Sequence, residues 1–121
     1  MAITQAVCTS FKQELLVEGH NFTNGQDTFK IALYTSSASL DASTTAFTTS
    51  NEVSDSGSYS SGGGSLTSVT PTTSGTTAIC DFADISFTSA TITARGAMIY
   101  NSSNSNKAVC ILDFGGDKTS T

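Results

Sequence analysis

The chain has 121 residues, a net charge of −5 and only 12% charged residues. This length suits one domain with a single modest core. The negative charge argues against a nucleic-acid-binding protein, which needs a basic surface, and against binding to an anionic membrane. No apolar run is long enough to cross a bilayer, and the first residues lack the basic and apolar regions of a signal peptide.

Serine and threonine replace the missing charged residues and make up 40 of the 121 positions. Threonine favours strands because its branched Cβ suits a pleated surface. Serine favours turns because its hydroxyl bonds to the nearby backbone. The composition therefore predicts one domain, residues 1–121, built mainly from strands and loops.

A single helix is expected over residues 4–18. Thr4 can cap its start, and Gly19 is placed to end it in a left-handed conformation. Apolar residues recur at helical spacing and predict one buried stripe. The stripe consists of Val7, Cys8, Phe11, Leu15 and Leu16.

Period-two alternation of apolar residues predicts several strands. The first, residues 27–35, has Phe29, Ile31 and Leu33 on its expected inner face. Pro71 either ends the second strand or lies on a sheet edge. The remaining expected strands cover residues 66–70, 76–82, 84–87, 91–101 and 107–114.

Residues 91–114 are expected to form a hairpin whose polar loop spans residues 102–106. Gly115–Asp117 then predicts a turn, and no further strand follows it. The sheet would therefore expose the edge beside residues 107–114, which could accept a strand from a partner subunit. A second interpretation is a chain shorter than its relatives.

Residues 36–65 show the weakest signal for regular structure. A loop of thirty residues is unusual in a compact domain, so we expect anchoring side chains within it. The candidates are Leu40, Phe47, Val53 and Tyr59, which can pack on this domain or on a neighbour. A flexible arm is the alternative. The fold class that follows is α+β, mainly β, with the N-terminal helix packed on an antiparallel β-sandwich or barrel-like sheet.

Few residues are candidates for catalysis. His20 is the sole histidine and lies in an Asn- and Gly-rich loop, without a second base near it in the sequence. The carboxylates of Asp81, Asp84, Asp113 and Asp117 are scattered over strands and turns. Gly62–Gly64 lacks the lysine of a phosphate loop and precedes no helix, and no helix follows Gly115–Gly116. We expect no enzyme, and no catalytic, cofactor-binding or metal-ligating residue.

Cys8, Cys80 and Cys110 fit neither a zinc site nor a redox pair, and their simplest interpretation is three buried free thiols. A disulfide between Cys80 and Cys110 would require neighbouring strands. Arg95, the sole arginine, is expected to form a structural ion pair, with Asp81 or Asp84 as its partner.

Several stretches resemble small virion proteins of tailed bacteriophages. They are residues 1–6 and 10–14, residues 27–34, residues 52–54, 57–59 and 62–66, residues 91–100 and residues 112–118. The resemblance spans nearly the whole chain and rests on structural motifs. Proteins of this type commonly continue into one more apolar strand, which this sequence lacks after Lys118.

The resemblance implies a non-enzymatic structural subunit of a phage virion, made in the host cytoplasm and located in the particle. A capsid decoration or cement protein is the first expectation, with binding to the major capsid protein as a homo-oligomer, such as a trimer. The alternatives are a tail, baseplate or fibre component, and a receptor- or glycan-binding module. The expected assembly contacts are Tyr59, Leu66, Arg95 and Phe114.

Overall fold

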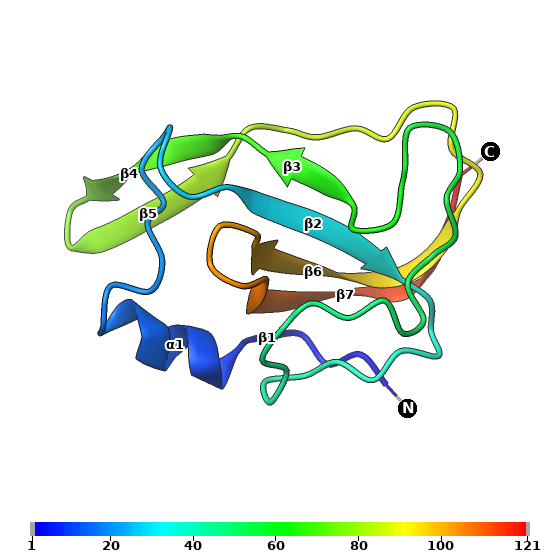
Figure 1. The fold of residues 1–121 in the computed structure, drawn as a ribbon, viewed down its shortest axis with the longest axis horizontal. Coiled ribbons are helices and arrows are strands. Elements are labelled where there is room, and N and C mark those ends of the chain that lie inside the picture. The colour runs from blue at the N-terminus through cyan, green and yellow to red at the C-terminus, as the bar shows by residue number, and fades with distance from the viewer. Residues whose placement is uncertain (1, 121) are drawn as a thin grey trace.

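Two antiparallel sheets and one short helix make up the fold of the computed structural model, which describes residues 2–120 (Figure 1). The larger sheet has the strand order β1-β7-β6-β2-β3, and a hairpin, β4–β5, forms the smaller one. The mainly β fold class expected from the sequence, with an N-terminal helix, is confirmed. The elements are β1 Ala6–Val7, α1 Thr9–Leu15, β2 Phe29–Tyr34, β3 Gly64–Leu66, β4 Ser68–Ser74, β5 Thr77–Phe82, β6 Thr93–Asn101 and β7 Lys107–Thr119.

Two clusters of buried side chains hold the large sheet. One surrounds Tyr34 and Met98 and also takes in residues of the N-terminal segment and α1. The other surrounds Tyr59 and Ile92, and Leu33 packs against it. In β2, Phe29, Ala32 and Tyr34 are buried in the first cluster, whereas Ile31 and Leu33 are only partly buried. The prediction that Phe29, Ile31 and Leu33 form the inner face was therefore wrong for Ile31 and Leu33.

The helix is shorter than the periodicity predicted. It spans Thr9–Leu15 rather than residues 4–18, because Ala6 and Val7 pair with β7 as strand β1. The Thr4 amide donates to the Leu40 carbonyl at 2.8 Å, so Thr4 caps no helix. Beyond the helix, Glu18 rather than Gly19 takes the left-handed conformation, with a φ of 62°.

The C-terminal strand is longer than predicted. The hairpin of residues 91–114 is confirmed, but β7 continues through Gly115 to Thr119, where it pairs with Thr93. The expected turn at Gly115–Asp117 is absent from this strand, because the positive φ of Gly115 is accommodated within it. The edge beside residues 107–114 is also partly covered, since β1 pairs with Cys110 and Ile111.

The predicted strand 66–70 falls on the end of β3 and the start of β4, because Thr67 lies outside both strands. The predicted strand 76–82 is confirmed as β5, which pairs with β4. Pro71 lies inside β4 at an irregularity of the pairing between Val69 and Thr72, a position that tolerates its missing N–H. Residues 84–87 form no strand, so that prediction was wrong. In Figure 1 the hairpin extends to the left, beyond the ends of β6 and β7.

The segment of residues 36–65 is anchored on its own domain. Leu40, Val53 and Tyr59 are buried, and Phe47 stacks on Tyr100 with ring centroids 4.6 Å apart. These are the four anchors that the sequence suggested. Within residues 2–120, no helix is long and apolar enough to cross a membrane.

Candidate functional site

The four expected assembly contacts do not share one surface. Tyr59 is fully buried, and its hydroxyl donates to Glu52 and accepts from the Leu33 amide. Burial and the bond to Glu52 raise the pKa of Tyr59. Leu66 and Phe114 are partly buried against different core clusters. Tyr59 therefore has no surface to offer a partner in this structure.

Arg95 is paired, but with a carboxylate other than those expected. Its Nε lies 2.9 Å from the Asp113 carboxylate, because the pairing of Gly96 with Asp113 brings β6 and β7 side by side. The hydrogen bond from Arg95 lowers the pKa of Asp113. Asp81 and Asp84 lie on or after β5 and make no ion pair with Arg95. The guanidinium thus joins two neighbouring strands.

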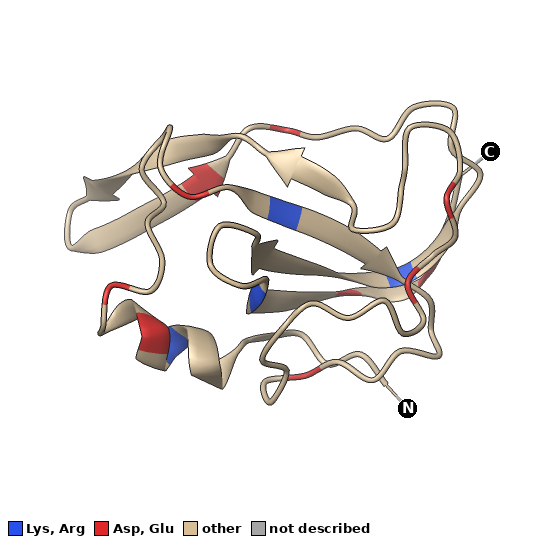
Figure 2. Ribbon diagram, viewed as in Figure 1, with Lys and Arg blue, Asp and Glu red and all other residues tan. Residues whose placement is uncertain are grey.

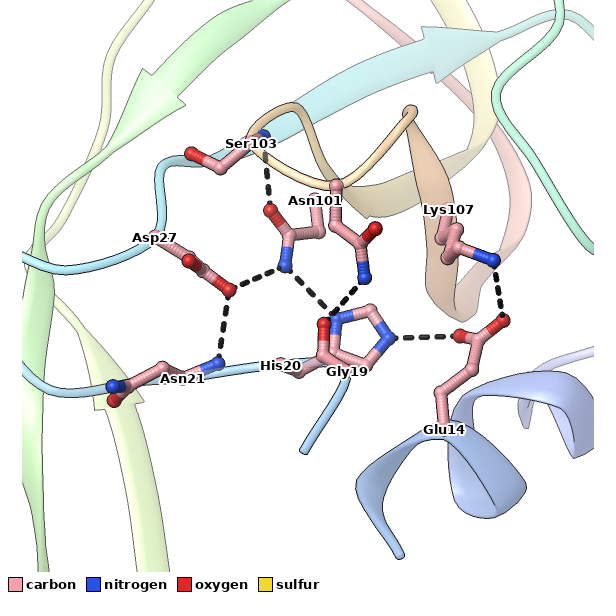
Figure 3. Close-up of polar contacts among 9 residues, drawn as sticks. Glu14, Gly19, His20, Asn21, Asp27, Asn101, Ser103 and Lys107 are labelled. Atoms are coloured by element: carbon pink, nitrogen blue, oxygen red, sulfur yellow. Dashed lines mark hydrogen bonds and ion pairs between the residues drawn. The ribbon is translucent and has the colours of Figure 1, made fainter. Parts of the chain in front are cut away.

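His20 lies at the centre of a buried polar network (Figure 3). Its Nε2 is 2.8 Å from Glu14 Oε1, and its Nδ1 is 3.0 Å from the Asn101 amide nitrogen. The same amide donates to Asp27 at 2.8 Å, and Glu14 also contacts Lys107 at 3.5 Å. Both ring nitrogens are occupied and the ring is inaccessible to solvent. The network joins α1, the loop before β2 and the β6–β7 turn.

Within residues 2–120, no three His, Cys, Asp or Glu side chains are placed to hold a metal ion. The glycines at positions 62–64 have structural roles. Gly62 receives the Tyr100 hydroxyl on its carbonyl and donates its amide to Glu52 at 2.7 Å. A Cβ on Gly63 would overlap the carbonyl of Ile31.

The clearest surface feature is an apolar groove of about 610 Å³ beside the β4–β5 hairpin. Phe11 and Leu15 of α1 form one wall, and Ile79 and Phe82 of β5 form the other. Val109 of β7 lies among the lining residues. Asp81 is the sole charged residue that lines it. We call this feature the hairpin groove.

Exposed apolar side chains gather around the hairpin groove. The large hydrophobic residues that are more than two-fifths exposed are Val7, Leu15, Leu16, Val17, Val69 and Ile79. Three of them line the groove, two directly follow Leu15, and Val69 lies in β4 of the hairpin. An exposed apolar patch of this kind typically marks a contact site for another molecule.

The charge distribution separates this surface from the rest of the molecule. In Figure 2 the hairpin carries one acidic position, in β5, and no basic one. That position is Asp81. A hairpin without cations offers no basic surface to nucleic acid or an anionic membrane. Its apolar lining instead suits the apolar side chains of another protein chain.

Two of the three cysteines lie in the hairpin groove. Cys80 is exposed on β5 and Cys110 is half-buried on β7, while Cys8 is buried. All three are free thiols, although Cys80 is not buried as expected. The strands of Cys80 and Cys110 belong to different sheets. Burial raises the pKa of Cys110 to about 11, so this thiol is protonated at neutral pH.

Sequence reasoning missed the groove because its walls come from distant parts of the chain. Val7, Leu15 and Leu16 were assigned to a buried stripe, and residues 76–82 to a strand. In the structure only Cys8 and Phe11 of that helical stripe are buried. The one available signal was the number of apolar residues in and just after α1, which exceeds what a helix of two turns can bury.

Comparison with protein-family models, with curated proteins and with solved structures gave no significant match.

Proposed function

We propose that this chain is a non-enzymatic structural subunit of a bacteriophage virion, and that it acts as a capsid decoration or cement protein. The observation that carries the proposal is the collection of exposed apolar side chains around the hairpin groove. When another protein covers exposed apolar residues that lie together at one site, the free energy of the system falls. The resemblance of the sequence to small phage virion proteins supplies the biological setting.

The remainder of the molecule supports a structural role. The polar network of His20 and the ion pair of Arg95 each join elements of the fold. Tyr59 and Tyr100, the residues that a glycan-binding module would use, are 0% and 3% exposed. They offer no aromatic platform to a sugar, so nothing in this surface favours the receptor-binding alternative.

The mechanism would be stabilisation by mass action. A subunit that binds the assembled shell and not the open one shifts the equilibrium toward the assembled state. Burial of the apolar patch would supply the binding free energy, at about 25 cal/mol for each Å² removed from water. Many copies, each bound with modest affinity, would together stabilise the particle.

Copy number and particle stability test the proposal. Quantitative mass spectrometry of purified particles should find hundreds of copies, whereas a tail, baseplate or fibre component would be present in tens or fewer. Particles that lack the protein should release DNA at a lower temperature, and added purified protein should restore the higher temperature. Absence from purified particles would overturn the virion role.

A matched pair of variants links the effect to the hairpin groove. Leu16, 86% exposed, can be changed to aspartate without loss of core packing. The L16D protein should fail to restore particle stability. Thr49→Asp adds the same charge at an exposed loop position outside the groove lining and should restore it fully. Equal rescue by both variants would exclude the patch as the contact.

A further inference from the structure

The hairpin groove follows β5 along most of its length. Five consecutive residues of β5, 78–82, line it. Because successive side chains of a strand point to opposite faces, a groove bordered by five residues in a row reaches the edge of the strand as well as one face.

The backbone bonds of β5 show which amides face this edge. Ala83 donates its amide to Thr67, on the β4 side, whereas the amide of Phe82 turns to the Asp81 carboxylate at 2.8 Å. Because strand amides alternate between the two edges, the amides of Cys80 and Ala78 point the same way as that of Phe82. Within residues 2–120, β5 pairs with β4 alone. The outer edge is thus free to accept another strand.

We propose that the occupant of this edge is β5 of a second copy of the chain, paired antiparallel about a two-fold axis. The inference deepens the proposed function by naming a partner for the hairpin groove. Each hairpin would enter the groove of the other copy, and the two hairpins would form one four-stranded sheet. A two-stranded hairpin alone is marginally stable, so this pairing would also stabilise β4–β5.

The number of residues available suits a small dimer interface. A standard interface takes about 800 Å² and 20–30 residues from each partner. The thirteen residues that line the groove, together with Thr77, Leu16 and Val17, make sixteen from each copy, somewhat fewer than that standard.

Charge and side-chain packing favour one register of the pairing. With Ile79 opposite its own copy, Asp81 lies opposite Thr77, and Ala78 lies opposite Cys80. Sliding one strand by four residues would place Asp81 opposite Asp81, where like charges repel. The Ile79 register instead puts two β-branched side chains together. An isologous contact of this kind closes at two copies, so a dimer takes the place of the trimer expected from the sequence.

Sedimentation velocity of the purified protein tests the inference. Wild type should sediment as a dimer at micromolar concentration. Ile79→Lys places two cations opposite each other and should weaken dimerisation at least tenfold. Thr73→Lys adds the same charge at an exposed position of β4 in the same hairpin, outside the groove lining, and should dimerise as wild type does.

A second variant distinguishes loss of the dimer from loss of folding. Ala78→Pro removes one outward amide without adding charge, at an edge position where proline is tolerated. It should be a monomer with an unchanged circular dichroism spectrum. Dimerisation of both Ile79→Lys and Ala78→Pro at wild-type strength would overturn the inference, as would a wild type that stays monomeric at millimolar concentration.

Thiol cross-linking checks the register. In a background with Cys8 and Cys110 changed to serine, a short bismaleimide should join the two Cys80 thiols, which the Ile79 register places diagonally across the strand pair, about 7–8 Å apart. No covalent dimer in a sample that sediments as a dimer would overturn pairing through β5. A monomeric wild type that still enters particles would refute the dimer and leave the virion role intact.

Discussion

At the residue scale, His20 and Asn101 show how a few polar side chains hold distant segments together. The Asn101 amide contacts both His20 and Asp27, and its carbonyl accepts from the Ser103 amide at 3.0 Å. Asn101 is fully buried. Burial of an amide that keeps all its hydrogen-bond partners costs little free energy. Burial of the same amide without them carries a desolvation penalty.

Replacing His20 by alanine should therefore destabilise the fold. The change removes an aromatic ring packed 4.8 Å from Phe11 and leaves Glu14 and Asn101 each without one partner. We expect a loss of about 2–4 kcal/mol in the free energy of unfolding, measured by urea denaturation. Thr49→Ala, an exposed control, should change it by less than about 0.5 kcal/mol. A similar value for both variants would show that the network adds no stability.

The pair of Arg95 and Asp113 predicts a dependence on acid pH. Its hydrogen bond lowers the pKa of Asp113 below the ordinary 3.8, so the folded state favours the ionised carboxylate. The stability that this carboxylate contributes is then fully present above pH 3.8 and is lost as the pH falls through its folded pKa.

Urea denaturation of wild type and Asp113→Asn over a pH series should reveal this dependence. Wild type should be the more stable protein at neutral pH, and the difference should shrink at pH values below 3.8. Both side chains reach solvent, so added salt should also reduce it. A difference that persists unchanged at the lowest pH would assign the effect to packing rather than to charge.

At the element scale, the joining of β3 to β2 depends on one close backbone approach. Gly63 has a φ of 82°, and a Cβ there would overlap the carbonyl of Ile31. The next residue, Gly64, begins β3 and pairs with Ile31. Only glycine satisfies both the positive φ and the contact. The Gly-rich stretch of residues 62–64 therefore serves to place β3 beside β2 at the edge of the sheet.

Gly63→Ala should therefore cost at least about 2 kcal/mol of unfolding free energy, since left-handed strain and steric overlap act together. Gly116→Ala is the matched control, because a Cβ at this position of β7 meets nothing within 4 Å. Thermal unfolding followed by circular dichroism compares the two. Equal melting temperatures would contradict the steric argument.

The elements also show where periodicity fails as a guide. The pattern of Val7, Phe11 and Leu15 predicted a helix of fifteen residues, yet residues 6–7 joined β7. A backbone amide gains a partner in either structure, and tertiary contact with the edge of β7 decided between them. In β7 the glycines at 115 and 116 suggested a turn, but pairing with β6 extends past them.

At the scale of the whole molecule, net charge opposes the proposed dimer. Each copy carries −5, so two copies repel each other at long range. Salt screens this repulsion, since the Debye length falls from about 30 Å at 0.01 M to about 3 Å at 1 M. The apolar contact at Ile79 is not weakened by salt.

Dimerisation should therefore strengthen as salt is added. Between about 0.01 M and 0.5 M sodium chloride, the dissociation constant measured by sedimentation should fall several-fold. The Thr73→Lys control, which lowers the net negative charge, should show a weaker dependence. Weakening of the dimer by salt would instead point to an interface held by opposite charges, which the hairpin groove does not provide.

The local patterns of the chain were enough to predict its class, most of its strands and the anchors of its long loop. Alternation, glycine placement and isolated apolar residues act over a few neighbours, and they identified β2, the β6–β7 hairpin and the burial of Leu40 and Val53. The partners of His20 could not be predicted, because Glu14 and Asn101 meet its ring only in the folded chain. Nor could the hairpin groove, because tertiary structure alone decides which apolar residues remain uncovered. Val7, Leu15 and Ile79 share one surface only because pairing with β7 shortens the helix and the β4–β5 hairpin stands apart from the large sheet.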